Sequence, residues 1–211
     1  MKITERNLRR TIRKAVSGLL NERADEKEWA YLLSSPFSAR NALAAHYCDH
    51  YDADSILEVG GYRNPITQFY KGPASRITMV DPMLTNSRQV HKTGGNKCNV
   101  TQLRGRLHDF DIEPHDTVVC LGMSLYDTDT NEQRSYDRFK ELCKSAKTVI
   151  MEVPTEWEHS VNSANDLMHT LPHEKIVDIS MDFTPSNVKD IEKIHNKRRL
   201  IVLRNESRGK N

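Results

Sequence analysis

The stretch S-I-L-E-V-G-G-Y-R-N-P-I, residues 55–66, decides how this sequence is interpreted. Its apolar residues Ile56, Leu57 and Val59 predict a short strand that is buried on both faces. Gly60 and Gly61 follow at once, and two glycines allow the backbone to turn sharply and a ligand to approach it closely. The stretch therefore predicts a buried strand that ends in a ligand-binding turn.

The Asn64-Pro65 pair comes directly after this turn. Asparagine is a good helix N-cap and proline is favoured at the first helical position, so we expect a helix that starts at Pro65. The N–H groups at the tip of such a helix favour an anion, and Arg63 supplies a second, charged donor to a carboxylate or phosphate.

Short apolar runs continue through the rest of the chain and alternate with polar, helix-like stretches. Alternating strands and helices predict right-handed βαβ units and a mostly parallel, doubly wound α/β sheet. The last two runs lie close together, so we expect one of them to run antiparallel at the edge of the sheet. The seven expected strands cover residues 55–60, 76–81, 98–102, 117–122, 148–153, 175–180 and 199–203.

The second expected strand ends in an acid, Asp81, about twenty residues after Gly60. In doubly wound sheets ligands bind outside the carboxyl ends of the strands, and an acid at this spacing can accept hydrogen bonds from ribose hydroxyls. The glycine turn and Asp81 together predict a nucleoside-binding site.

The region before residue 51 reads as a helical extension. Residues 4–20 form an amphipathic pattern with a basic face, which is either a solvated helix or an arm for an acidic partner or nucleic acid. A second helix is expected over residues 26–33 and a third from Ser38. We therefore expect a helical extension at 1–50, a doubly wound α/β domain at 51–205 and a flexible tail at 206–211.

Composition narrows the functional class. The 211 residues carry a net charge of only +2, which argues against a general nucleic-acid coat. There is no long apolar run for a membrane span and no secretory signal, so we expect no membrane partner. The four cysteines form no C-x-x-C pair and no metal-ligand spacing, which is typical of a reducing cytoplasm and predicts no metal site.

Four stretches together resemble the class I S-adenosylmethionine-dependent methyltransferases, over roughly residues 40–204. They are ILEVGG, TMVDP, HDTVVCLGMSLYD and KTVIMEVP. The resemblance implies a seven-stranded Rossmann-like sheet that finishes with a hairpin, and S-adenosyl-L-methionine as cofactor. The cofactor-binding residues that it implies are Glu58, Gly60, Gly61, Arg63, Asp81, Asp109, Phe110, Gly122 and Met123, with Asp109 and Phe110 at the adenine.

Residues beyond the later strand ends are the candidates for catalysis. Methyl transfer requires an aligned nucleophile, exclusion of water and sometimes removal of a proton. We expect these roles at Tyr126, Asp127, Glu152 and His159, with Trp157 as a wall of the acceptor pocket. A small-molecule or peptide acceptor is favoured over nucleic acid because the net charge is small.

Two alternatives stay open at this stage. Tyr62 and Asn64 stand where the family usually has its second and third glycines, which permits a non-catalytic Rossmann-like binding module without the cofactor. A dinucleotide-dependent oxidoreductase is the other alternative, although the G-x-G-x-x-G pattern is missing.

Overall fold

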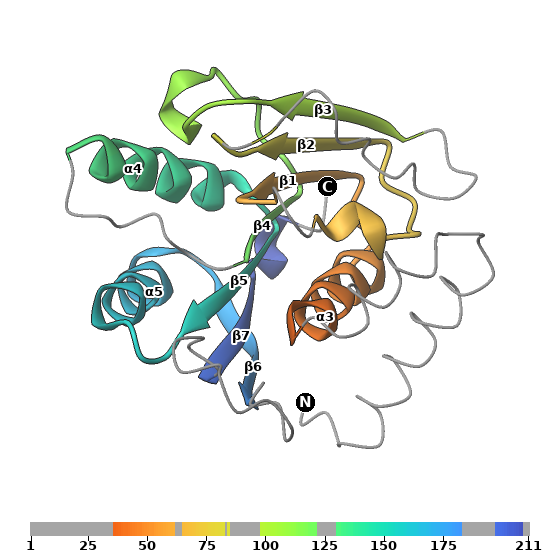
Figure 1. The fold of residues 1–211 in the computed structure, drawn as a ribbon. Helices are drawn as coiled ribbons and strands as arrows, with labels where there is room; N and C mark the ends of the chain where they lie inside the picture. Colours follow the sequence, from red (N-terminus) through yellow and green to blue (C-terminus); the bar gives the residue numbers. More distant parts are fainter. Residues whose placement is uncertain are drawn as a thin grey trace.

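The computed structural model describes residues 36–61, 65–82, 84, 98–121, 130–182 and 197–208. Within them a seven-stranded sheet has the order β3-β2-β1-β4-β5-β7-β6 (Figure 1). The strands are β1 Ser55–Val59, β2 Arg76–Val80, β3 Asn99–Leu103, β4 Thr117–Leu121, β5 Thr148–Pro154, β6 Glu174–Asp182 and β7 Lys197–Arg204. The helices are α3 Pro36–His50, α4 Thr130–Ser145 and α5 Glu158–Thr170, and the 3-10 helices are η1 Ile66–Gln68, η2 Leu107–Asp109 and η3 Glu206–Arg208.

The strand pattern confirms the predicted fold class, a mostly parallel, doubly wound α/β sheet. Strands β1 to β5 pair in parallel, whereas β7 is antiparallel to both β5 and β6. We expected the antiparallel strand to lie at the edge of the sheet, and this position was wrong. The antiparallel strand β7 lies inside the sheet, between β5 and β6, and β6 forms the edge. The physical reason is burial: Leu200 to Leu203 of β7 are all fully buried, while β6 alternates with exposed residues.

Two apolar cores lie on opposite faces of the sheet, with α3 on one face and α4 and α5 on the other (Figure 1). Successive strand residues point to opposite faces. In β1, Ile56 joins the core beneath α3, and Leu57 joins the core beneath α4 and α5. The near-continuous apolar runs in the sequence are explained by this double coverage.

Several predicted boundaries need correction. Helix α3 begins at Pro36 rather than near Ser38. The helix expected from Pro65 is only the three-residue η1, and Pro65 itself is extended, with φ −68° and ψ 149°. The first residues of the expected flexible tail form η3, and the Asn205 side chain accepts hydrogen bonds from Ser207. The predicted helices at 4–20 and 26–33 lie outside the described residues.

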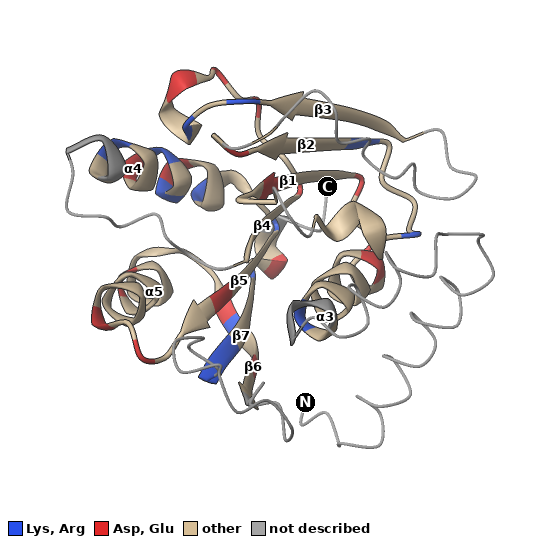
Figure 2. Cartoon of the chain, viewed as in Figure 1, with Lys and Arg blue, Asp and Glu red and all other residues tan. Residues whose placement is uncertain are grey.

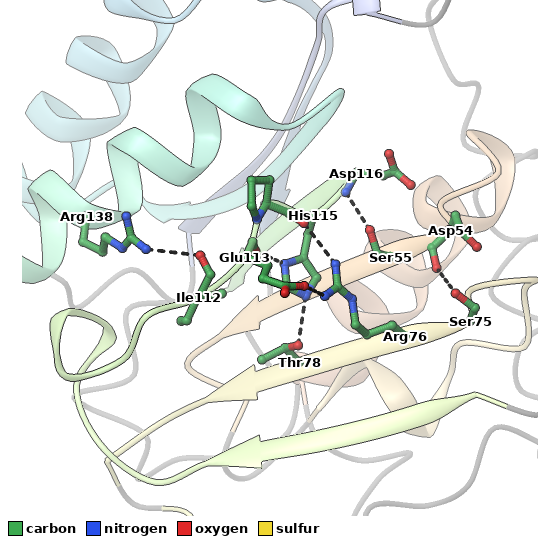
Figure 3. Close-up of polar contacts among 11 residues, drawn as sticks. Asp54, Ser55, Ser75, Arg76, Thr78, Ile112, Glu113, His115, Asp116 and Arg138 are labelled. Carbon is green, nitrogen blue, oxygen red and sulfur yellow. Dashed lines mark hydrogen bonds and ion pairs between the residues drawn. The ribbon is translucent and has the colours of Figure 1, made fainter. Parts of the chain in front are cut away.

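A polar network joins the amino-terminal ends of the strands, opposite the expected ligand-binding edge (Figure 3). His115, just before β4, lies 2.7 Å through Nδ1 from the Glu113 carbonyl oxygen and 2.9 Å through Nε2 from Thr78 Oγ1 of β2. Arg76 binds the Glu113 carboxylate, and the Asp116 N–H donates to Ser55 Oγ at 2.9 Å. These contacts tie β1, β2 and the segment before β4 together near their amino-terminal ends.

None of the helices in the described parts of the chain is long and apolar enough to cross a membrane.

Candidate functional site

The glycine turn lies at the carboxyl end of β1, beside the end of β2. The Gly60 N–H donates to the Val80 carbonyl at 2.9 Å, and the pairing of Val59 with Val80 brings Gly60 next to Asp81. Gly60 has a φ of +84°, a backbone conformation that residues with a side chain rarely adopt. Two of the predicted binding elements, the turn and the acid, therefore meet as the sequence indicated.

Glu58 lies directly beneath this turn. A Cβ atom built on Gly61 would stand 2.7 Å from Glu58 Cδ, so only glycine fits there without displacing the carboxyl group. Glu58 is 1% exposed, and its Oε1 accepts a hydrogen bond from the Ile66 N–H at 2.8 Å. Its Oε2 has no hydrogen-bond partner among the described residues. Burial raises the pKa of Glu58 to about 8.

This contact corrects the prediction of an anion site at the tip of a helix from Pro65. The helix is a single 3-10 turn, and the N–H of its first residue, Ile66, is bound by the carboxyl group of Glu58. A donor that is already satisfied inside the protein does not attract an external anion. The turn therefore presents a buried carboxyl group, whereas the sequence predicted a row of free N–H donors.

Asp81 is 8% exposed and connects the ends of β2 and β3 through its backbone. Its N–H donates to the Leu103 carbonyl of β3 at 3.2 Å, and its own carbonyl accepts from the Gly105 N–H at 3.4 Å. The loop after β3 is thereby held next to the end of β2.

The predicted adenine contacts Asp109 and Phe110 lie on this loop, in and after η2. The Asp109 side chain is 49% exposed, and its Oδ2 accepts from the Arg106 N–H at 2.7 Å. Phe110 packs partly against the core beneath α4, and a Cβ atom on Gly105 would stand 2.8 Å from its ring. Both side chains are therefore held in place by the turn, and the Asp109 carboxylate remains accessible.

Glu152, at the end of β5, is fully buried between two guanidinium groups. Arg40 Nη1, from α3, donates to Glu152 Oε2 at 2.8 Å, and Arg198 Nη1, from β7, lies 3.0 Å from Oε1 with the geometry of an ion pair rather than a hydrogen bond. Arg40 and Arg198 are 8% and 7% exposed. Figure 2 shows acidic and basic segments adjacent where β5 and β7 pair.

The role of Glu152 as a catalytic base stays a prediction, and the structure places this side chain inside the protein with no exposed surface. Its two carboxylate oxygens face the guanidinium groups of Arg40 and Arg198 inside the protein. Its geometry fits a positioning role, because it joins α3, β5 and β7 at the end of the sheet.

The remaining predicted residues are His159 and five residues outside the described parts of the chain. His159 is exposed in the first turn of α5, and its ring stacks on Trp157 with centroids 5.7 Å apart. Arg63, Gly122, Met123, Tyr126 and Asp127 lie outside the described residues.

The sequence reasoning missed Arg40 and Arg198. Arg40 lies beside Asn41 in an alanine-rich helical run, and Arg198 lies in β7 two residues before its fully buried part begins at Leu200. Charged residues in apolar surroundings are almost never fully buried unless they are paired, which is the signal that could have identified them. The partner of Arg40, however, is Glu152, which lies 112 residues later in the sequence, so the sequence pattern around Arg40 does not identify it.

Solved structures with this fold include several methyltransferases. The N-methyltransferase NodS from Bradyrhizobium japonicum WM9, in complex with S-adenosyl-l-homocysteine, aligns with a TM-score of 0.54 at 12% identity over 90% of this chain and 98% of that chain. The Thermoplasma acidophilum protein 1320 aligns with a TM-score of 0.58 at 10% identity, covering 93% and 98%. The magnesium protoporphyrin IX methyltransferase ChlM from Synechocystis PCC 6803 aligns with a TM-score of 0.51 at 12% identity, covering 91% and 90%.

These likenesses show that this chain shares the Rossmann-like fold of these structures. No protein family and no curated protein matches the sequence.

Proposed function

We propose that this protein is an S-adenosylmethionine-dependent methyltransferase. The observation that carries the proposal is the arrangement of Gly60, Gly61, Glu58 and Asp81 at the adjoining ends of β1 and β2. In a doubly wound sheet this is the edge at which ligands bind. The structures of NodS with S-adenosyl-l-homocysteine and of ChlM with S-adenosylmethionine support the choice of cofactor.

The residues present fit this cofactor. Glu58 holds a buried oxygen without a partner among the described residues, and leaving such an atom unsatisfied costs roughly 1–3 kcal/mol. Gly61 has no Cβ atom, so the backbone of the turn lies close to this carboxyl group. Asp81 would accept hydrogen bonds from the ribose hydroxyls, and Asp109 would accept from the adenine amino group with Phe110 against the ring.

When bound, S-adenosylmethionine supplies an electrophilic methyl group on a sulfonium. The protein has to orient the acceptor, exclude water and receive a proton where the acceptor carries one. Tyr126, Asp127 and His159 are the residues proposed to meet the acceptor. Glu152, held by Arg40 and Arg198, would keep the end of β5 rigid beneath it.

A small-molecule or peptide acceptor is our proposal, because the net charge of +2 gives little general attraction to nucleic acid. The extension at residues 1–50 is proposed to serve as a lid or acceptor wall, and its helix α3 packs on one face of the sheet. The four cysteines form no C-x-x-C pair in the sequence, which supports a reducing cytoplasm as the location.

Isothermal titration calorimetry with S-adenosylmethionine and S-adenosylhomocysteine tests the proposal. Micromolar binding of both would support it, and a screen for methylated products by mass spectrometry would then identify the acceptor. Absence of binding heat with both ligands, at several temperatures, would instead support a binding module without this cofactor.

A further inference from the structure

Glu58 is placed to respond to the charge of a ligand. Its carboxyl group lies beneath Gly61, with one oxygen committed to the Ile66 N–H and the other without a partner among the described residues. The side chain is 1% exposed, so water cannot screen it. A charged ligand group bound next to Gly60 and Gly61 would therefore interact with the Glu58 carboxyl group in a medium of low polarity.

The charged and titratable groups around Glu58 come from three elements. Arg40 of α3 favours the ionised carboxylate, whereas Asp81 at the end of β2 opposes it. The thiols of Cys48, from α3, and Cys120, from β4, are buried, and burial raises the pKa of each thiol, so both stay neutral. Burial outweighs the attraction of Arg40, and the pKa of Glu58 rises to about 8.

We propose that Glu58 is protonated in the free protein, releases its proton when S-adenosylmethionine binds, and takes a proton up again when the cofactor has become S-adenosylhomocysteine. This inference rests on the proposed function. The substrate form of the cofactor carries one positive charge more than the product form, because methyl transfer converts a sulfonium into a neutral thioether. A positive charge nearby favours a carboxylate, and its removal favours the acid.

The proton balance is simple. On binding of the sulfonium, the Glu58 carboxylic acid becomes a carboxylate and one proton passes to the buffer. After methyl transfer the carboxylate regains one proton from solvent. Glu58 would thereby be a specificity-determining residue, because its charge makes the site prefer the cofactor over the product that must leave.

The protons released can be counted by calorimetry at pH 7.0 in phosphate and in Tris, whose ionisation enthalpies differ. With a pKa of about 8, Glu58 is about nine-tenths protonated at this pH. We expect release of about 0.9 proton more with S-adenosylmethionine than with S-adenosylhomocysteine. The dissociation constant for S-adenosylhomocysteine divided by that for S-adenosylmethionine should also rise about tenfold from pH 6.0 to pH 7.0.

The variant Glu58→Gln keeps an oxygen for the Ile66 N–H but cannot ionise. We expect it to bind S-adenosylhomocysteine within about threefold of wild type and to lose both the extra proton release and the pH dependence of the ratio. The amino group of each ligand titrates equally in both proteins, so their difference isolates Glu58. Glu174→Gln, at an exposed acid in β6, is the matched control and should behave as wild type.

Equal proton counts for the two ligands with wild-type protein would overturn the inference while leaving the proposed function intact. An unchanged pH dependence in Glu58→Gln would do the same. If neither ligand bound to wild type, the proposed function would fall and this inference with it. The wild-type proton count needs no variant, so it decides the question even where Glu58→Gln does not fold.

Discussion

Replacing Glu152 by glutamine tests the buried cluster at the end of β5. The substitution keeps the shape of the side chain and removes its charge. In the wild type, one carboxylate with no exposed surface accepts from Arg40 at 2.8 Å and lies 3.0 Å from Arg198. In the variant the two guanidinium groups lose the carboxylate that they share.

The expected size of the effect follows from this burial. Removing one partner of a buried ion pair typically destabilises a protein by about 3–5 kcal/mol, because the remaining charge is left uncompensated. Since the glutamine oxygen still accepts one hydrogen bond, we expect Glu152→Gln to lower the free energy of unfolding by about 3–4 kcal/mol. We expect Arg40→Met to lower it by about 2 kcal/mol, because Glu152 then keeps Arg198 and the methionine stem still packs.

Urea unfolding followed by circular dichroism at 222 nm measures both changes. Glu174→Gln makes the same chemical change at an exposed site and should stay within about 0.5 kcal/mol of wild type. If Glu152→Gln abolished methyl transfer but lost less than about 1 kcal/mol of stability, Glu152 would be a base and our positioning role would be wrong.

Three further predictions concern the turn and the opposite end of the sheet. Asp81→Ala should weaken S-adenosylmethionine binding by about 1–3 kcal/mol in calorimetry, and an unchanged dissociation constant would remove Asp81 from the site. Gly61→Ala should lower the free energy of unfolding in urea by about 1–3 kcal/mol, because its Cβ would stand 2.7 Å from Glu58 Cδ; wild-type stability would contradict this packing. Burial lowers the pKa of His115 below its ordinary value, so its contribution to stability is complete above about pH 6.5 and is lost as the pH falls below that value toward the folded-state pKa. His115→Gln should therefore lose less stability than wild type between pH 7.5 and pH 5.5 in urea unfolding, and equal losses would refute this.

The sequence alone determined the fold class and most strand positions. Strands that are buried on both faces require nearly continuous apolar runs. Each such run is local in the sequence, so it can be recognised without knowing the rest of the structure. The turn at Gly60 and the acid at Asp81 were also predictable, because a strand end and its next residue are neighbours along the chain. Their meeting follows from the parallel pairing of β1 with β2.

Only the tertiary structure decided which charged side chains meet. Glu58, Glu152 and Arg198 share the α3 face because strand order and register align them, and Arg40 reaches Glu152 from a helix 112 residues earlier in the chain. The raised pKa of Glu58 depends in the same way on burial by several elements at once. Periodicity reports the face on which a side chain lies, but its partners and its exposure to water are set by segments distant in the sequence, and these control the charge of a buried acid.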